Sequence, residues 1–428
     1  MLCVSVIFLA ALAAAQSLMK PVPVLRKSDP SFSFRAAFTH SQNGLIVDAD
    51  LNITTSRPTV NIFNTMGIQS VSCTRDGLSV RFSDQFSILD AYSTWSGTED
   101  LALFVSYGER CPDDGLKIFA VVDLNPTILD ELWIIDITAV KLTNEQVLKG
   151  YSLSIINRDR VDDYEVSLDL NYDPKSNSAT KKNIQMLDET DAKISCVNCY
   201  TSGTARLHYD VKGQFFTGFK SYNLTLYGDL TANLDLKLDI LTSTDSKHLD
   251  LKTIYAQELF SVTVAGLFTF TPSFKLLGGI AHETQKPIKS TAGFKIDYPF
   301  NLQATSDSLL KPPQFISLGK PKTTPHLPMI SGDLSVEPHL VPRFDFALDV
   351  LSQSLNMDLS MDNSAEARLS ASNQTTCPLG VDIHFFSQSR IDLGVQSTLL
   401  ADSRHWTLFD TGKYEFPCNE CQCTKRVD

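Results

Sequence analysis

The longest regular pattern in the chain is an alternation of apolar and polar residues between positions 222 and 240. The apolar residues occupy even positions: Tyr222, Leu224, Leu226, Leu230, Ala232, Leu234, Leu236, Leu238 and Ile240. The odd positions, Tyr227 apart, are polar. Successive side chains of a strand point to opposite faces. The pattern therefore predicts a long strand with one face on a core and the other in water.

Similar alternation recurs along most of the chain. Apolar residues take odd positions from 45 to 53, even positions from 344 to 350, and odd positions from 355 to 369. The change of parity at 352–354 predicts a turn or bulge, because otherwise one of the two runs would face water. Further strands are predicted at 78–82, 166–172, 260–270 and 383–395.

Three segments, 101–107, 116–124 and 132–142, are apolar at both parities. This pattern is typical of central strands that are covered on both faces.

One short helix is predicted after Ser83, which can act as its N-cap. Phe86, Leu89, Tyr92 and Trp95 recur at every third position and predict its apolar stripe.

Two segments break the strand pattern. Residues 173–193 are almost entirely polar and predict a solvated linker or long loop. Residues 311–342 contain seven prolines and predict an extended surface crossing or an edge segment, because proline cannot donate to a strand ladder. No fixed-period repeat is visible.

These patterns predict an all-β protein of two domains. A β-sandwich-like N-terminal domain with one short helix would span 17–172. The polar linker, 173–193, would connect it to a larger domain of long antiparallel amphipathic strands at 194–428.

The first fifteen residues have the features of a signal peptide. Residues 2–15 are apolar or small and end in three alanines, Ala13, Ala14 and Ala15. The run is too short to span a bilayer, and no other stretch approaches the roughly 20 apolar residues that a membrane helix needs. We therefore expect export without a membrane span, to the extracellular space or the cell wall.

The cysteines and sequons fit this compartment. Eight of the nine cysteines remain after residue 15, an even set that predicts disulfides. They are Cys73, Cys111, Cys196, Cys199, Cys377, Cys418, Cys421 and Cys423. Three sequons predict N-glycans at Asn52, Asn223 and Asn373, and the first two asparagines lie on the polar parity of their strands.

Position in the chain suggests how the cysteines pair. Cys73 would pair with Cys111, and Cys196 with Cys199. Cys377 would pair with Cys418, Cys421 or Cys423, and the sequence does not decide which of these three. A zinc site built from the cysteines is an alternative, but export and the lack of histidines at metal-ligand spacing disfavour it.

The formal net charge of −12 and the pI of about 5.1 argue against nucleic-acid partners and anionic membranes, both of which need a basic surface.

Candidate catalytic chemistry is sparse. The chain has no Gly-x-Ser-x-Gly or His-Glu-x-x-His motif. The run between Glu131 and Asp136 loosely resembles the carboxylate strand of β-sandwich glucanases, but the opposite parity of these two residues would aim them at opposite faces of a strand. The acidic pairs at 113–114 and 162–163 could bind calcium, although solvated turns explain them as well. No catalytic, cofactor-binding or metal-binding residue is predicted.

Two parts of the chain resemble tandem domains of unknown function in secreted fungal proteins. The first includes Cys73, Trp95 and Cys111 within residues 71–111, where the resemblance implies a short strand, a helix that ends in tryptophan and an apolar strand. The second is similar to the start of a following domain at 194–203. The resemblance implies no catalytic or binding residue.

We therefore expect a secreted, non-catalytic glycoprotein of the cell wall or extracellular matrix that binds polysaccharide or a partner protein. A carbohydrate-active enzyme is one alternative, which would need two carboxylates in a groove. A carrier of lipid or another hydrophobic ligand is a second, which would need an apolar tunnel.

Overall fold

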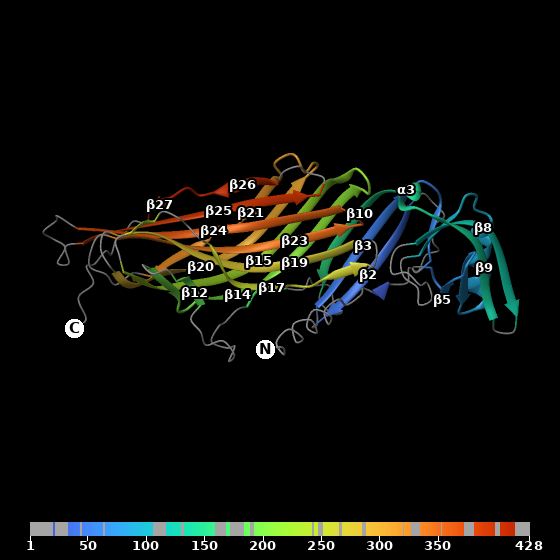
Figure 1. The fold of residues 1–428 in the computed structure, drawn as a ribbon, viewed down its shortest axis with the longest axis horizontal. Coiled ribbons are helices and arrows are strands. Elements are labelled where there is room, and N and C mark those ends of the chain that lie inside the picture. Colours follow the sequence, from blue (N-terminus) through green and yellow to red (C-terminus); the bar gives the residue numbers. More distant parts are fainter. Residues whose placement is uncertain are drawn as a thin grey trace, which may run out of the picture.

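A computed structural model describes most of the chain (Figure 1). The described residues are 20–21, 33–42, 45–62, 65–105, 117–129, 132–158, 168–171, 184–188, 192–241, 244–246, 251–264, 268–284, 288–319, 321–326, 334–351, 353–371, 381–398 and 403–415.

The described residues form three sheets, none of them closed, and two helices, so the all-β prediction is confirmed. The twelve-stranded sheet contains β1 (Lys20–Pro21), β2 (Ser33–Gln42), β3 (Leu45–Thr55), β10 (Leu148–Arg158), β11 (Leu168–Asp169), β12 (Ile184–Asp188), β13 (Ala192–Cys196), β14 (Tyr200–Gln214), β15 (Gly218–Ile240), β20 (Ile288–Ser306), β21 (Gln314–Leu318) and β22 (Lys322–His326). The nine-stranded sheet contains β16 (Thr244–Ser246), β17 (Lys252–Glu258), β18 (Val262–Val264), β19 (Phe268–Thr284), β23 (Leu334–Val350), β24 (Gln353–Ala371), β25 (Val381–Ser397), β26 (Arg404–Asp410) and β27 (Tyr414–Glu415). The six-stranded sheet contains β4 (Thr59–Asn61), β5 (Ile68–Cys73), β6 (Gly77–Phe82), β7 (Ala102–Val105), β8 (Lys117–Leu129) and β9 (Leu132–Leu142). The helices are α2 (Gln85–Ser96) and α3 (Asn144–Val147).

The two larger sheets pack face to face as a sandwich. Tyr209 of β14 stacks on Phe270 and Phe346 of the opposite sheet, with ring centroids 5.0 and 6.2 Å away. Phe300 of β20 lies 6.2 Å from Phe344 of β23. These aromatic rings fill the space between the sheets with side chains, as close-packed interiors require.

The parity prediction for β15 is confirmed. All nine of its predicted core residues, from Tyr222 to Ile240, are buried, and all of them except Ile240 belong to the hydrophobic core between the two large sheets. The polar residues at the odd positions of β15 face outward. Ala49, Leu51 and Ile53 of β3 are buried as predicted as well.

The six-stranded sheet is inserted between two neighbouring strands of the large sheet. β3 and β10 pair with each other, although residues 59–142 separate them in the sequence. The inserted sheet lies at one end of the elongated molecule (Figure 1). β7 joins the two cores, because Ala102 and Phe104 belong to the larger core while Leu103 and Val105 belong to the smaller one.

The structure therefore groups the strands differently from the expected two domains. β10 and β11 precede the expected linker, 173–193, yet both pair with β14, which follows it. β12 lies inside the expected linker and pairs with β13. The chain divides more naturally into the inserted sheet and the sandwich that flanks it.

Helix α2 forms where the sequence predicts it, but its cap and buried face differ. The N-cap is Asp84 rather than Ser83, because the Asp84 carboxylate accepts hydrogen bonds from the backbone N–H and the hydroxyl of Ser87, both at 2.8 Å. Phe86 is 79% exposed, whereas Trp95 is 2% exposed. Residues nine positions apart differ by about 180° around a helix, so a strict spacing of three does not stay on one face.

Removing the Asp84 cap should lower the stability of the inserted sheet region. We expect Asp84→Ala to cost about 1 kcal/mol, the usual effect of losing an N-cap, and Ser83→Ala to cost less than about 0.5 kcal/mol. Hydrogen bonds from Ser87 hold the pKa of Asp84 below its ordinary value, so the cap weakens as the pH falls through that lowered pKa. Chemical denaturation at neutral and acidic pH measures both effects. Equal losses in the two variants would contradict the assignment of the cap.

The prediction of fully covered strands is correct for β7 and wrong for most of β8 and β9. The four residues of β7 are buried. In the β8–β9 hairpin, however, Val122, Leu129 and Val140 are 64, 66 and 57% exposed. Apolar residues at both odd and even positions allow both faces of a strand to be buried. Whether both faces are buried depends on which elements pack against them.

The proline-rich segment was predicted correctly over only part of its length. β21 and β22 pair with β20 at the edge of the sheet, as expected for a proline-rich segment, because proline has no backbone N–H to donate to a second neighbour. Residues 334–342, in contrast, belong to β23, which lies between β19 and β24. Pro338 and Pro342 are tolerated there because the pairing with β24 is interrupted beside each of them. A turn or bulge is predicted at 352–354, and β23 and β24 form a hairpin next to it, with Val350 opposite Gln353 as its last pair.

Candidate functional site

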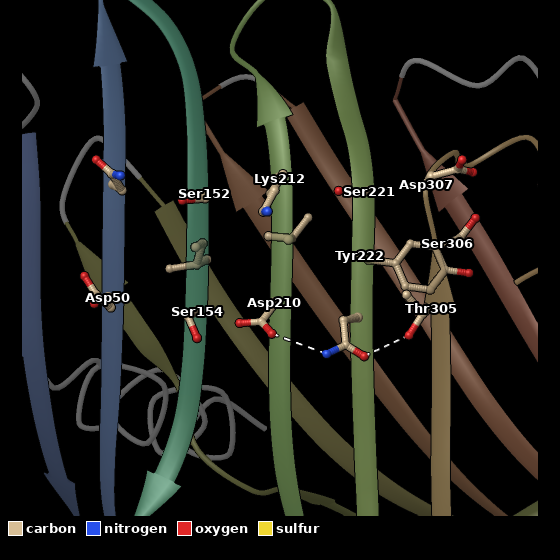
Figure 2. Close-up of a pocket in the computed structure, with 14 residues that line it drawn as sticks. Asp50, Ser152, Ser154, Asp210, Lys212, Ser221, Tyr222, Thr305, Ser306 and Asp307 are labelled. Carbon is tan, nitrogen blue, oxygen red and sulfur yellow. Dashed lines mark hydrogen bonds between the residues drawn. The ribbon is translucent and has the colours of Figure 1, made fainter. Parts of the chain in front are cut away.

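A polar pocket lies on the outer face of the twelve-stranded sheet (Figure 2). Its volume is about 610 Å³. Five adjacent strands, β3, β10, β14, β15 and β20, and Asp307 directly after β20 supply its wall. The residues from the strands are Asp50, Asn52, Ser152, Leu153, Ser154, Asp210, Val211, Lys212, Ser221, Tyr222, Asn223, Thr305 and Ser306.

Strand register brings the polar residues together in two rows across the sheet. One row runs Asp50, Ser154, Asp210, Asn223 and Thr305, each opposite the next on a neighbouring strand. All five have the outward parity of their strands, so their side chains share one surface.

The second row lies beside the first and runs Asn52, Ser152, Lys212 and Ser221. Together the rows present carboxylates, hydroxyls, amides and one ammonium group on a rigid sheet.

Hydrogen bonds fix the side chain of Asn223 in the first row. Its Oδ1 accepts from the hydroxyl of Thr305 at 3.0 Å and from Nε2 of Gln303 at 3.3 Å. Its Nδ2 donates to Asp210 on the other side, over 3.4 Å. The amide therefore bridges β20 and β14, and Figure 2 shows two of these bonds as dashed lines.

Asp210 stays ionised in this setting. Partial burial acts to raise the pKa of its carboxyl, but hydrogen bonds from His208, Ser154 and Asn223, together with the nearby His208 charge, outweigh burial and lower the pKa. His208 Nε2 lies 3.1 Å from the carboxylate. Asp210 is thus a hydrogen-bond acceptor in the middle of the pocket.

The pocket has more carboxylates than cations. Asp50, Asp210 and Asp307 line it, against Lys212 alone. The excess negative charge disfavours anionic ligands such as uronate polysaccharides. Neutral or amino-bearing ligands with many hydroxyl groups fit the donors and acceptors of both rows.

Two of the three predicted glycosylation sites line the pocket. Asn52 is exposed, and Asn223 is half-buried on its predicted polar face. Asn373 lies outside the described residues. No sequence pattern could place Asn52 and Asn223 on one surface, because that depends on β10 and β14 lying between their strands.

The cysteines are only partly described. Cys196 and Cys199 form a disulfide. Cys73 is disulfide-bonded, and its expected partner, Cys111, lies outside the described residues. So do the four remaining candidates, Cys377, Cys418, Cys421 and Cys423.

Of the acidic residues singled out in the sequence, only Asp136 is described, and it does not line the pocket. Asp136 is exposed on β9 in the inserted sheet, and Glu131 and the acidic pairs at 113–114 and 162–163 lie outside the described residues. Within the described ranges, no group of three or more His, Cys, Asp or Glu side chains could hold a metal ion. Neither described helix is long and apolar enough to cross a membrane.

A family model described as a domain of unknown function, DUF7223, matches residues 169–397, more than half of the 428-residue chain. The chain belongs to the DUF7223 family. Comparison with curated proteins and with solved structures finds no match. The DUF7223 region starts at 169, ahead of the domain start expected at Ile194.

The pocket combines the DUF7223 region with strands that precede it. Asp210, Asn223 and Thr305 lie inside the matched region, whereas Asp50 and Ser154 lie before it. The pocket is therefore complete only when β3 and β10 pair against β14.

Proposed function

We propose that this DUF7223 protein is a secreted, non-catalytic glycoprotein of the fungal cell wall or extracellular matrix that binds neutral polysaccharide in the polar pocket. The observation that carries the proposal is the pair of polar rows across five strands, which offers hydroxyl, amide and carboxylate partners to sugar hydroxyls. The signal-like N-terminus, the sequons and the even number of cysteines support export.

A polysaccharide hydrolase is the second candidate, because Asp50 and Asp210 lie in one row with only β10 between them. Two strand spacings put their backbones about 10 Å apart, near the carboxylate separation of inverting glycosidases. The general acid of such an enzyme needs a raised pKa, whereas the contacts of Asp210 lower its pKa. Asp210 is therefore unsuited to be the general acid, and we keep binding as the first candidate. The aromatic rings between the sheets disfavour a lipid carrier.

Filling the pocket should weaken binding. We expect Ser152→Tyr to weaken binding of a soluble β-1,3-glucan or chitin oligosaccharide at least about tenfold, or about 1.4 kcal/mol, because the ring would occupy the second row. Ser202→Tyr is the matched control, since Ser202 is exposed on the same outward face of β14 but does not line the pocket. Titration calorimetry on protein exported to a bacterial periplasm, which adds no N-glycans, measures both.

Three results would contradict the proposal. No binding of any neutral or amino-bearing glycan, or equal loss in both variants, would exclude the pocket as the site. Release of reducing sugar that disappears in Asp210→Asn would instead establish the hydrolase.

A further inference from the structure

The glycan-accepting nitrogen of Asn223 points along the wall of the pocket. Asp210 is ionised and can only accept, while the hydroxyl of Thr305 donates, so the network places Nδ2 toward Asp210 and Oδ1 toward Thr305. Nδ2 thus faces β14, beyond which β10 and β3 complete the pocket.

A glycan on this nitrogen would start inside the pocket. Glycosylation leaves one hydrogen on Nδ2, so the bond to Asp210 does not have to be given up. The first sugars would then lie over Ser154 and Ser152, whose hydroxyls are typical partners for sugar hydroxyls.

Tethering makes this contact favourable even for a weak site. A group held by a short linker has an effective concentration in the millimolar range. A pocket with a Kd of roughly 0.1 mM for free sugar would therefore be about nine-tenths filled by a glycan attached to its own wall.

We propose that the N-linked glycan on Asn223 occupies the polar pocket of the secreted protein and masks it from free polysaccharide. This inference rests on the proposed sugar-binding role of the pocket. Glycosylation at the sequon 223–225 then regulates sugar binding by the pocket, because the glycosylated form is closed to ligand and the unmodified form is open.

The first test follows the glycan itself and needs no free ligand. The protein is secreted from a eukaryotic host, and native samples are treated with an endoglycosidase while site occupancy at Asn223 is followed by peptide mass spectrometry. We expect cleavage at Asn223 to be about tenfold slower in the wild type and Ser202→Tyr than in Ser152→Tyr, where the tyrosine displaces the sugars. An unmodified Asn223, or equal cleavage in all three proteins, would overturn the inference.

The second test measures the mask. Thr225→Ala removes the sequon but keeps Asn223 and its hydrogen bonds, and Thr225→Ser keeps the sequon. From the same host, Thr225→Ala should bind a soluble β-1,3-glucan or chitin oligosaccharide about tenfold more tightly than the wild type and Thr225→Ser. Equal affinities would overturn the mask. Absence of binding in the unglycosylated bacterial protein would instead mark failure of the proposed function.

Discussion

Replacing Phe344 with alanine should destabilise the protein by about 3–5 kcal/mol, the usual cost of removing a fully buried phenylalanine. Phe344 is 0% exposed and lies in the centre of the sandwich. Its ring centroid is 5.2 Å from that of Phe274 in the same sheet and 6.2 Å from that of Phe300 in the opposite sheet. The substitution would open a cavity at the point where the two sheets meet.

Denaturant unfolding measures this loss. Phe216→Ala is the control, because Phe216 is 45% exposed and should lose less than about 1 kcal/mol. A small loss in Phe344→Ala, similar to that of the control, would contradict the packing of the two large sheets against each other.

Gly203→Ala should cost about 3 kcal/mol or more. Gly203 has a φ of +147°, a conformation that side-chain-bearing residues rarely adopt and that carries roughly 1–3 kcal/mol of strain. An added Cβ would also overlap the carbonyl oxygen of Asp229 on β15. β14 and β15 would have to separate at this point, in the middle of the sheet that carries the pocket.

Gly412→Ala is a control that tests the backbone strain without the steric overlap of an added Cβ. Gly412 has a φ of +65°, but its added Cβ would meet nothing within 4 Å, so we expect a loss of only about 1–2 kcal/mol. The same denaturant titration compares the two variants. If Gly203→Ala were no worse than Gly412→Ala, the close approach of β14 and β15 would be in doubt.

The proposed function and the mask both depend on the same strand register. A shift of β14 by one residue against β10 would turn Asp210 and Lys212 toward the core and remove the pocket. Stability and binding are therefore linked, and the Ser152→Tyr and Ser202→Tyr comparison should be made on variants with equal midpoints of unfolding.

The sequence by itself determined the local features of this protein. It gave the buried and solvent faces of β15, because the strand backbone fixes a period of two and each face shows a consistent residue type. The hairpin between β23 and β24 was visible for the same reason, as a change of parity. The sequence predicts helix α2 but places its N-cap at Ser83, one residue before the actual cap, Asp84. Both residue types are good N-caps, and only the geometry at Ser87 selects one of them.

The tertiary structure alone decided which strands are neighbours. The pairing of β3 with β10 across the inserted sheet, and of β10 with β14 across the polar segment, brings Asp50, Ser154 and Asp210 into one row. Parity shows that each of these residues faces outward, but it carries no information about register between distant strands. The pocket, the exposed hairpin of β8 and β9, and the shared surface of Asn52 and Asn223 all follow from long-range pairing, which depends on the packing of the whole chain.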